Sequence, residues 1–323
     1  MMRSLRRFLT SILIFIGMLI VLGSAAFAWI SIATINNVEG LSMTVSSGDE
    51  LLISFDGVNY GSSIPFENLS DQTEGIKLFD VTSPDGVNFE LGGLRSKGEA
   101  IPNQHYISFD LWLRSSELER DIYLFNNISN SIDYEDTGTT GTYITSKGVV
   151  WRSTLQFFNG PSLDDVVFKG DVGTYFAKDA MRLSIVELKD DLNPFDVREE
   201  SELRTFIFDP SGNPERGYAA TFGQFSYFFQ RTLIYVDLPD EIPNVSYRLS
   251  EMDPYNPYQA LDNESLIATL QPTNMVDPKN NKLFYTAKIR INIWIEGWDA
   301  DAFDAIDQDM VKIQLQFKSA KRA

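Results

Sequence analysis

Six acidic side chains close to the C-terminal end are the residues best suited to chemistry in this chain. They fall within EGWDADAFDAIDQD and are Glu296, Asp299, Asp301, Asp304, Asp307 and Asp309. Carboxylate oxygens at such close spacing can hold calcium, although the D-x-D/N-x-D/N-G order of an EF-hand loop is absent. If the stretch is helical, three of the aspartates recur every third residue and share one face that points to solvent. Two interpretations therefore stand, a calcium site formed by the first five acidic residues and a solvated crossover between two strands.

Other catalytic or metal-binding arrangements lack essential residues. The chain has no cysteine and His105 is its only histidine, so a zinc protease site with two histidines cannot be built. Neither HExxH nor GxSxG occurs, and we interpret His105 as a histidine at the edge of a strand. Two glycosidase carboxylates facing each other across a cleft cannot be recognised from sequence. The sequence therefore predicts a protein that is not an enzyme and has no cofactor apart from the calcium considered above, with a hydrolase as the remaining alternative.

Tryptophans offer a different kind of site. If Trp112, Trp294 and Trp298 are exposed together, they form a platform on which sugar rings can stack. Aromatic residues on the second face of a strand are more often covered by a loop or a helix. Both interpretations stay open.

The segments that must position these residues have the pattern of β-strands. Apolar and other residues alternate in 107–113, 287–295 and 311–317, and within 181–188 at Met181, Leu183 and Ile185, which is typical of strands with one buried face. Asp-Gly pairs at 56–57 and 85–86 indicate hairpins, and 232–239 is a further candidate strand. Phe303 and Ile306 recur at helical spacing, which predicts one or two turns of helix on the sheet. Because no long helical pattern occurs, we predict an all-β, jelly-roll-like antiparallel β-sandwich with short helices and long loops.

The N-terminal residues resemble a secretory leader. Arg3, Arg6 and Arg7 precede an uncharged apolar stretch that ends in AFA, which predicts a hydrophobic leader helix at 1–28 that signal peptidase removes after Ala28. The alternative is a retained anchor, since residues 8–30 are long enough to span a bilayer and would be the protein's only membrane contact. Either way, residues 29–323 are expected to form a single large domain outside the membrane, extracellular or at the cell surface. Insertions are expected around 130–180 and 190–230.

Composition limits the partners. The chain has 45 acidic and 27 basic residues and a net charge of -18, which disfavours nucleic acid because phosphate contacts need clustered Lys and Arg. With 43% hydrophobic residues the chain can form a packed core, and without cysteine it relies on that core rather than on disulfides.

The start of the expected mature chain, WISIATI, is apolar and β-prone. Such a segment can add itself to an exposed sheet edge of another molecule, or it can pair within its own sandwich. The residues predicted to form an inter-subunit strand are Trp29, Ile30, Ile32 and Ile35.

Several stretches together resemble a known group of exported proteins. They are AFAWISIATINNVEGLSMTV, LLISFDG, HYISFDLWLRSSELERDIYLFN, IRINIWIEGWDADAFDAI and VKIQLQF. The group comprises proteins of Gram-positive bacteria and their relatives with a leader of the SipW type, and it includes the TasA/camelysin biofilm-fibre proteins. The resemblance implies a jelly-roll-like sandwich outside the cell and, for TasA-like members, fibres in which each subunit lends its N-terminal strand to the next. Camelysin members have been classed as metalloproteases, and this chain departs from that label.

Two functions are compatible with these observations. The first is a non-enzymatic secreted or cell-surface structural protein, a subunit of fibres or of a biofilm matrix that associates with itself. The second is a membrane-tethered extracellular module that binds a carbohydrate or another polymer.

Overall fold

The computed structural model describes residues 12–18, 36–46, 51–65, 76–78, 80–92, 98–118, 120–128, 132–135, 138 and 140–323. The chain divides into two compact units, Met1–Ala33 and Thr34–Ala323. In the first unit, residues 12–18 form a helix with exposed side chains. No helix within the described residues combines the length and the apolar character that crossing a membrane requires. Trp29, Ile30, Ile32 and Ile35, the predicted inter-subunit strand, lie outside the described residues.

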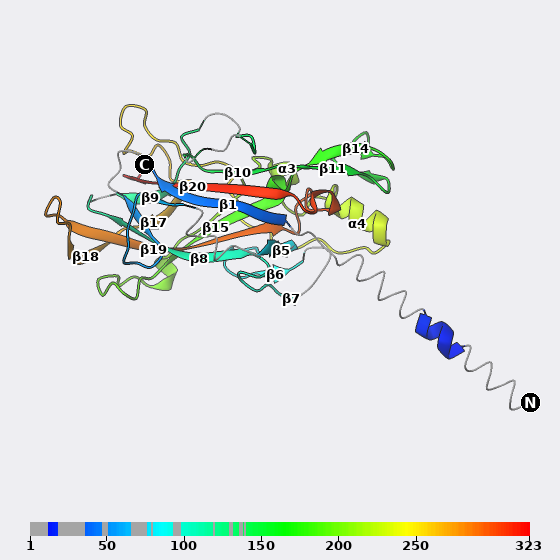
Figure 1. Cartoon of the computed structure of the whole chain (residues 1–323), viewed down its shortest axis with the longest axis horizontal. Coiled ribbons are helices and arrows are strands. Elements are labelled where there is room, and N and C mark those ends of the chain that lie inside the picture. The colour runs from blue at the N-terminus through cyan, green and yellow to red at the C-terminus, as the bar shows by residue number, and fades with distance from the viewer. Residues whose placement is uncertain are drawn as a thin grey trace, which may run out of the picture. The chain divides into compact units, whose positions relative to one another are not determined.

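The second unit is built mainly of two sheets (Figure 1). The seven-stranded sheet has the order β17 (Leu266–Thr269), β9 (Asp121–Leu124), β20 (Met310–Ala320), β1 (Asn36–Val45), β3 (Ser63–Ile64), with β10 (Tyr143–Ser146) paired to β20 and β4 (Lys77–Leu78) paired to β1. The nine-stranded sheet has the order β16 (Thr205–Phe208), β15 (Met181–Leu188), β19 (Leu283–Glu296), β5 (Asp80–Thr82), β6 (Glu90–Leu91), β7 (Gly98–Glu99), with β8 (Ile107–Ser115) and β18 (Gln271–Val276) paired to β19 and β2 (Leu52–Ser54) paired to β8.

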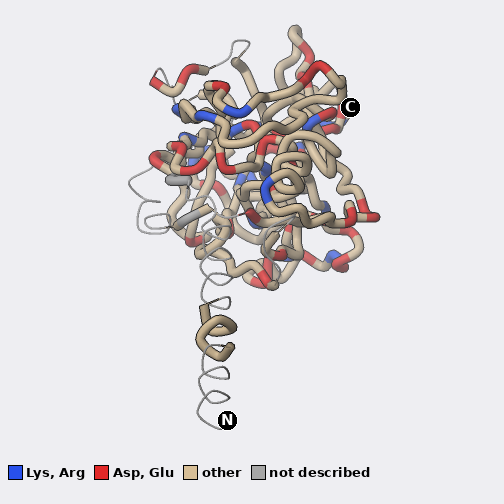
Figure 2. Tube along the Cα trace, turned by 90° about the vertical axis from the view of Figure 1, so that its right-hand side faces the viewer, with Lys and Arg blue, Asp and Glu red and all other residues tan. Residues whose placement is uncertain are grey.

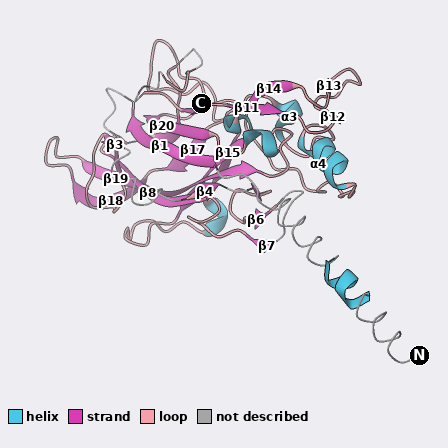
Figure 3. Ribbon diagram, turned by 45° about the vertical axis from the view of Figure 1, so that its right-hand side comes forward, coloured by secondary structure: helices cyan, strands magenta, loops and turns pink. Residues whose placement is uncertain are grey.

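Smaller elements gather at one end of this unit, where the helices α3 and α4 lie beside two short hairpins (Figure 3). The hairpins are β11 (Val149–Arg152) with β14 (Val172–Tyr175) and β12 (Phe157–Phe158) with β13 (Val166–Val167). The helices at this end are α3 (Pro214–Gly217), α4 (Gln224–Thr232) and the 3-10 turns η2 (Ala177–Ala180) and η4 (Asp304–Ile306), while the 3-10 turn η3 (Glu200–Glu202) lies elsewhere, after β15. Apart from η4, these elements fall in or next to the two predicted insertions.

The core lies between the two large sheets. The inward residues of β8 and β19, such as Leu111, Ile289 and Ile291, share one buried cluster with Ile313 and Leu315 of β20. Period-two alternation places these side chains on one face of each strand, and burial of that face against the other sheet is the main stabilising term. The prediction of an all-β, sandwich-like fold is therefore confirmed. Most pairs are antiparallel, while β1 runs parallel to β20 and β5 parallel to β19.

The predicted Asp-Gly hairpins form two loops of the same construction. Oδ1 of Asp56 accepts the backbone N–H groups of the residues two and three further along, at 2.8 and 2.7 Å, and Oδ1 of Asp85 does the same at 2.8 and 2.8 Å. Gly57 and Gly86 have φ of 69° and 72°. A Cβ on Gly86 would lie 2.9 Å from Cβ of Ser184, so glycine lets this loop lie directly on the nine-stranded sheet.

Three expectations differ from the structure. The second half of β19 is buried on both faces, because the loop after β5 covers Asn292 and Trp294. The helical turns expected around Phe303 reduce to the single 3-10 turn η4. The strand predicted at 232–239 is wrong. Helix α4 occupies the chain up to Thr232, Leu233 closes the helix in the left-handed conformation, and residues 233–239 contain no strand.

Acidic positions are spread over the second unit, with fewer basic positions between them (Figure 2).

Candidate functional site

The acidic stretch forms the crossover from β19 to β20, residues 296–309, and thus links the two sheets. Glu296, Asp299 and Asp309 are each only 1% exposed, and Asp301, Asp304 and Asp307 are half-buried. The face of Asp301, Asp304 and Asp307, which was expected to point to solvent, is half-buried, because tertiary contacts cover part of it. What surrounds each carboxylate decides what the crossover can do.

Arg182 of β15 is the centre of the most deeply buried part. Its side chain is almost completely buried, and Nη2 lies 2.9 Å from Oδ2 of Asp209, which follows β16. The same nitrogen contacts Oδ2 of Asp299 and donates to the carbonyl oxygen of Gly217. Nη1 donates to the carbonyl oxygen of Met181 at 2.7 Å. A single guanidinium thus joins β15, the end of β16, α3 and the crossover.

The carboxyl groups around Arg182 hold protons more tightly than usual. Burial raises the pKa of Asp299 well above its ordinary value, against the opposing effect of Arg182. Burial likewise raises the pKa of Asp209 and of Glu296. Glu296 accepts hydrogen bonds from Nε1 of Trp294 at 3.0 Å and from the backbone N–H of Trp298 at 3.1 Å. Because a charged carboxylate loses hydration on burial, the neutral form is favoured here.

Two of the half-buried aspartates, Asp301 and Asp304, pair with arginines from the helical end. Arg216 of α3 donates to both carboxylate oxygens of Asp301, from Nε at 2.8 Å and Nη2 at 2.6 Å. Arg231 of α4 forms an ion pair with Asp304. Tyr227 donates its hydroxyl to Oδ2 of Asp304 at 3.0 Å. These contacts tie α3 and α4 to the crossover.

In the contacts described, Asp309 accepts hydrogen bonds from backbone N–H groups. Its oxygens accept N–H groups from Gly148 at 2.8 Å, from Ala177 at 2.7 Å and from Met310 at 2.8 Å. Several hydrogen bonds to the charged form are the usual way in which a buried carboxylate is stabilised. Asp309 therefore fixes the start of β20 to η2 and to the turn before β11.

Aromatic side chains complete this end of the sandwich. Phe303 of the crossover is fully buried, and its ring centroid lies 5.3 to 5.8 Å from four other rings. We call the five residues the aromatic end cluster, and they are Trp151, Phe157, Tyr175, Tyr227 and Phe303. The cluster joins both hairpins and α4 to the crossover, and most of its ring pairs are edge-to-face, a favourable geometry.

In the part of the chain that the structure describes, no group of three or more His, Asp and Glu side chains is placed to hold a metal ion. The carboxylates of Asp299, Asp301 and Asp304 face arginines, and a guanidinium competes directly with a cation for the same oxygens. The arrangement is suited to joining segments of the fold.

Calcium is accordingly expected to leave the stability of the protein unchanged. Calcium at a concentration of 100 times the Kd of a site would stabilise the fold by about 2.7 kcal/mol, which a melting experiment detects easily. Melting of the protein with a chelator and with millimolar calcium measures this, and magnesium serves as the matched control. If calcium but not magnesium raises the Tm, and Asp301→Asn abolishes this rise, the interpretation of the acidic residues as a calcium site would be correct.

The tryptophans do not form a common platform. Trp294 is fully buried, with the ring of Phe89 edge-on at 5.2 Å, so for this residue the interpretation of an aromatic side chain covered by a loop applies. Trp112 and Trp298 are half-buried, and Nζ of Lys288 lies 4.8 Å from the ring centroid of Trp112. The alternation of apolar and other residues predicts which side chains share a strand face, but it does not predict that the loop after β5 covers part of that face.

His105 lies in the turn before β8, as expected for a histidine at the edge of a strand. Its Nδ1 accepts the backbone N–H of Ile101 at 2.9 Å. Burial lowers the pKa of His105, since the charged imidazolium loses hydration.

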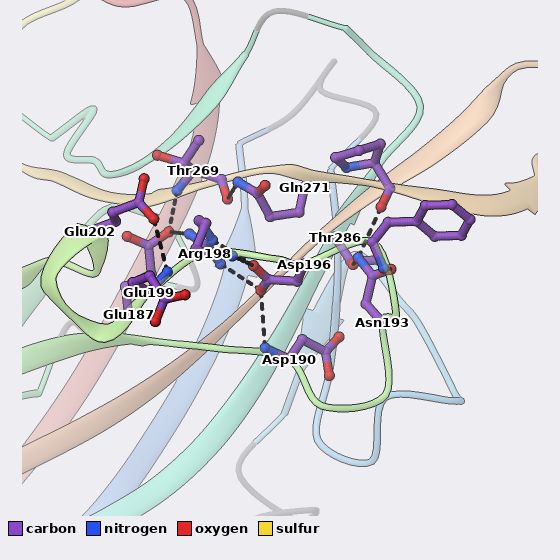
Figure 4. A network of polar contacts seen from close by, with 12 residues as sticks. Glu187, Asp190, Asn193, Asp196, Arg198, Glu199, Glu202, Thr269, Gln271 and Thr286 are labelled. Atoms are coloured by element: carbon purple, nitrogen blue, oxygen red, sulfur yellow. Dashed lines mark hydrogen bonds and ion pairs between the residues drawn. The ribbon is translucent and has the colours of Figure 1, made fainter.

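A second polar cluster was not anticipated from the sequence (Figure 4). Arg198 pairs with the buried Glu187 of β15 and donates to Asp196 from Nε and Nη2, both at 2.8 Å. Glu187 also accepts the backbone N–H of Thr269 at 2.7 Å. The charged stretch DDLNPFDVREESELR is thus anchored to β15 and β17. A lone glutamate at the apolar end of the 181–188 pattern was the available signal for this contact.

Comparisons with models of protein families, with curated proteins and with solved structures found no match to this chain.

Proposed function

We propose that the protein is a non-enzymatic, exported structural protein of the cell surface or extracellular matrix. In this proposal it is a fibre subunit that associates with its own copies by donating the strand at its mature N-terminus. The observation that carries the structural part is the crossover, whose acidic residues bind arginines and backbone groups of the fold. A carboxylate held in this way stabilises an arrangement of segments and is withdrawn from an incoming substrate.

The position of β1 supports donation of the segment before it. The described part of β1 begins at Asn36, directly after Trp29–Ile35, and β1 pairs in parallel with the C-terminal strand β20. On the other side of β1, the described partners β3 and β4 are two residues long each. An apolar segment that precedes such a strand can reach an exposed sheet edge of a neighbouring copy, where main-chain hydrogen bonds supply affinity.

Removal of residues 29–35 is expected to abolish filaments of the exported protein in electron micrographs, because the donated strand is lost. The deletion stops before β1, so cooperative unfolding of the remaining unit is expected to persist. Intact filaments from the shortened chain would refute strand donation.

A matched pair of variants separates strand chemistry from chain length. Ile32→Val keeps a β-prone apolar side chain and is expected to assemble normally. Ile32→Asp places a charge on the face that must be buried in the neighbour and is expected to prevent assembly. Equal filament yield from both variants would contradict the proposal.

A further inference from the structure

The buried charges around Arg182 do not balance. Asp209, Glu296 and Asp299 are nearly inaccessible to solvent, and Arg182 is the one comparably buried arginine or lysine beside them in the part of the chain described. We infer that residues 296–301 act as a proton-dependent latch. The latch holds α3 and α4 on the sandwich while these carboxyl groups carry protons, and it loosens when they lose them.

The latch acts on the helices through backbone contacts. The N–H groups of Ala219 and Gln224 donate to the carbonyl oxygens of Trp298 and Ala300, at 2.8 and 2.7 Å. In return, the N–H of Ala300 donates to the carbonyl oxygen of Arg216 at 2.9 Å. A Cβ on Gly223 would overlap the carbonyl oxygen of Ala300, so the two backbones are in direct contact. A small displacement of the crossover therefore breaks several hydrogen bonds at once.

Electrostatic repulsion supplies the displacement. With all three carboxyl groups charged, a region that excludes water would contain three negative charges and one guanidinium. Further charged or titratable groups face the cluster from the packed elements, namely Asp179 of η2, Arg216 of α3, Asp301 of the crossover, Tyr218 and Tyr247. Arg216 is already paired with Asp301, so it offers little compensation. The charges of Asp179 and Asp301 add to the repulsion.

The direction of the pH effect follows from the raised pKa values of Asp209, Glu296 and Asp299. A carboxyl group that binds its proton more tightly in the folded protein than in the unfolded chain stabilises the fold in its neutral form. This contribution is complete below the ordinary values of 3.8 for aspartate and 4.5 for glutamate. It is lost as the pH rises through the raised values, so the latch weakens toward alkaline pH.

Amide hydrogen exchange of the exported protein at pH 5 and pH 9 tests the latch, after correction for the intrinsic exchange rate. Residues 214–232 and 296–306 are expected to lose protection by about tenfold or more at pH 9, since one pKa unit corresponds to a factor of ten. The centres of β8 and β19 are expected to keep their protection. A uniform loss over both sheets, or no local loss, overturns the inference.

Conservative variants identify the groups responsible. Asp299→Asn and Glu296→Gln keep the side-chain shape, remove one titrating group each and are expected to reduce the pH response. Asp304→Asn alters a half-buried residue of the same crossover that lies outside residues 296–301 and pairs with Arg231, and it is expected to retain the full response, even if its protection is lower at both pH values. An unchanged response in both buried-site variants also overturns the inference. If either variant does not fold, the other variant and the unmodified protein still decide the question.

Discussion

Replacement of Arg182 by methionine is expected to lower the free energy of unfolding by about 3–5 kcal/mol near neutral pH. The change leaves Asp209 and Asp299 buried without their shared guanidinium, and it leaves the carbonyl oxygens of Met181 and Gly217 without their donor. Methionine fills much of the vacated volume, so the loss comes chiefly from charge and hydrogen bonding. Urea denaturation followed by tryptophan fluorescence measures it.

The pH dependence of this loss provides an internal check. As the pH falls, the two aspartates take up protons and need the guanidinium less, so the deficit of Arg182→Met is expected to shrink as the pH falls through their raised pKa values. Arg290→Met is the matched control, because Arg290 also lies on a central strand and pairs with Asp110 but has a 48% exposed side chain. An exposed pair contributes about 1 kcal/mol or less. Similar losses for the two variants would show that Arg182 is not the centre of the crossover.

The strands could be predicted because their signal is local. In β8, each apolar residue from Ile107 to Leu113 is buried and each intervening residue is half-exposed, as period-two alternation requires. The same alternation in β15 placed Met181, Leu183 and Ile185 correctly, yet it gave no reason to expect Arg182 inside. Arg182 is covered by segments that lie far along the chain, at Asp209, Gly217 and Asp299. The burial of Arg182 follows from the packing of those segments and not from the local sequence pattern.

The crossover illustrates the same limit for the candidate site. Its acidic composition is plain in the sequence, and close carboxylates alone are compatible with calcium, with solvent or with arginine. The partners Arg182, Arg216 and Arg231 lie in three separate segments that show no common pattern. Their pairing with Asp299, Asp301 and Asp304 follows from tertiary structure, which brings β15, α3 and α4 to one end of the sandwich.

Phe303→Ala is expected to cost about 3–5 kcal/mol, the range for truncation of a fully buried phenylalanine. Phe303 contacts the other four rings of the aromatic end cluster, so the cavity would open between both hairpins and α4. Phe303→Leu retains much of the apolar volume and is expected to lose less. Phe158→Ala on neighbouring β12 is the control, since Phe158 is 40% exposed and its loss should be within about 1 kcal/mol.

The form of the unfolding curve distinguishes two ways in which Phe303→Ala can act. If the end cluster and the sandwich unfold together, the midpoint falls while the dependence on urea stays the same. If the hairpins and α4 unfold separately from the sandwich, a transition at lower urea concentration appears in the fluorescence of Trp151 while the core of the sheets remains folded. We expect the second result, because the hairpins and α4 reach the large sheets mainly through the crossover, its arginine pairs and Asp309. A single unshifted transition would show that these elements are held by contacts other than the aromatic end cluster.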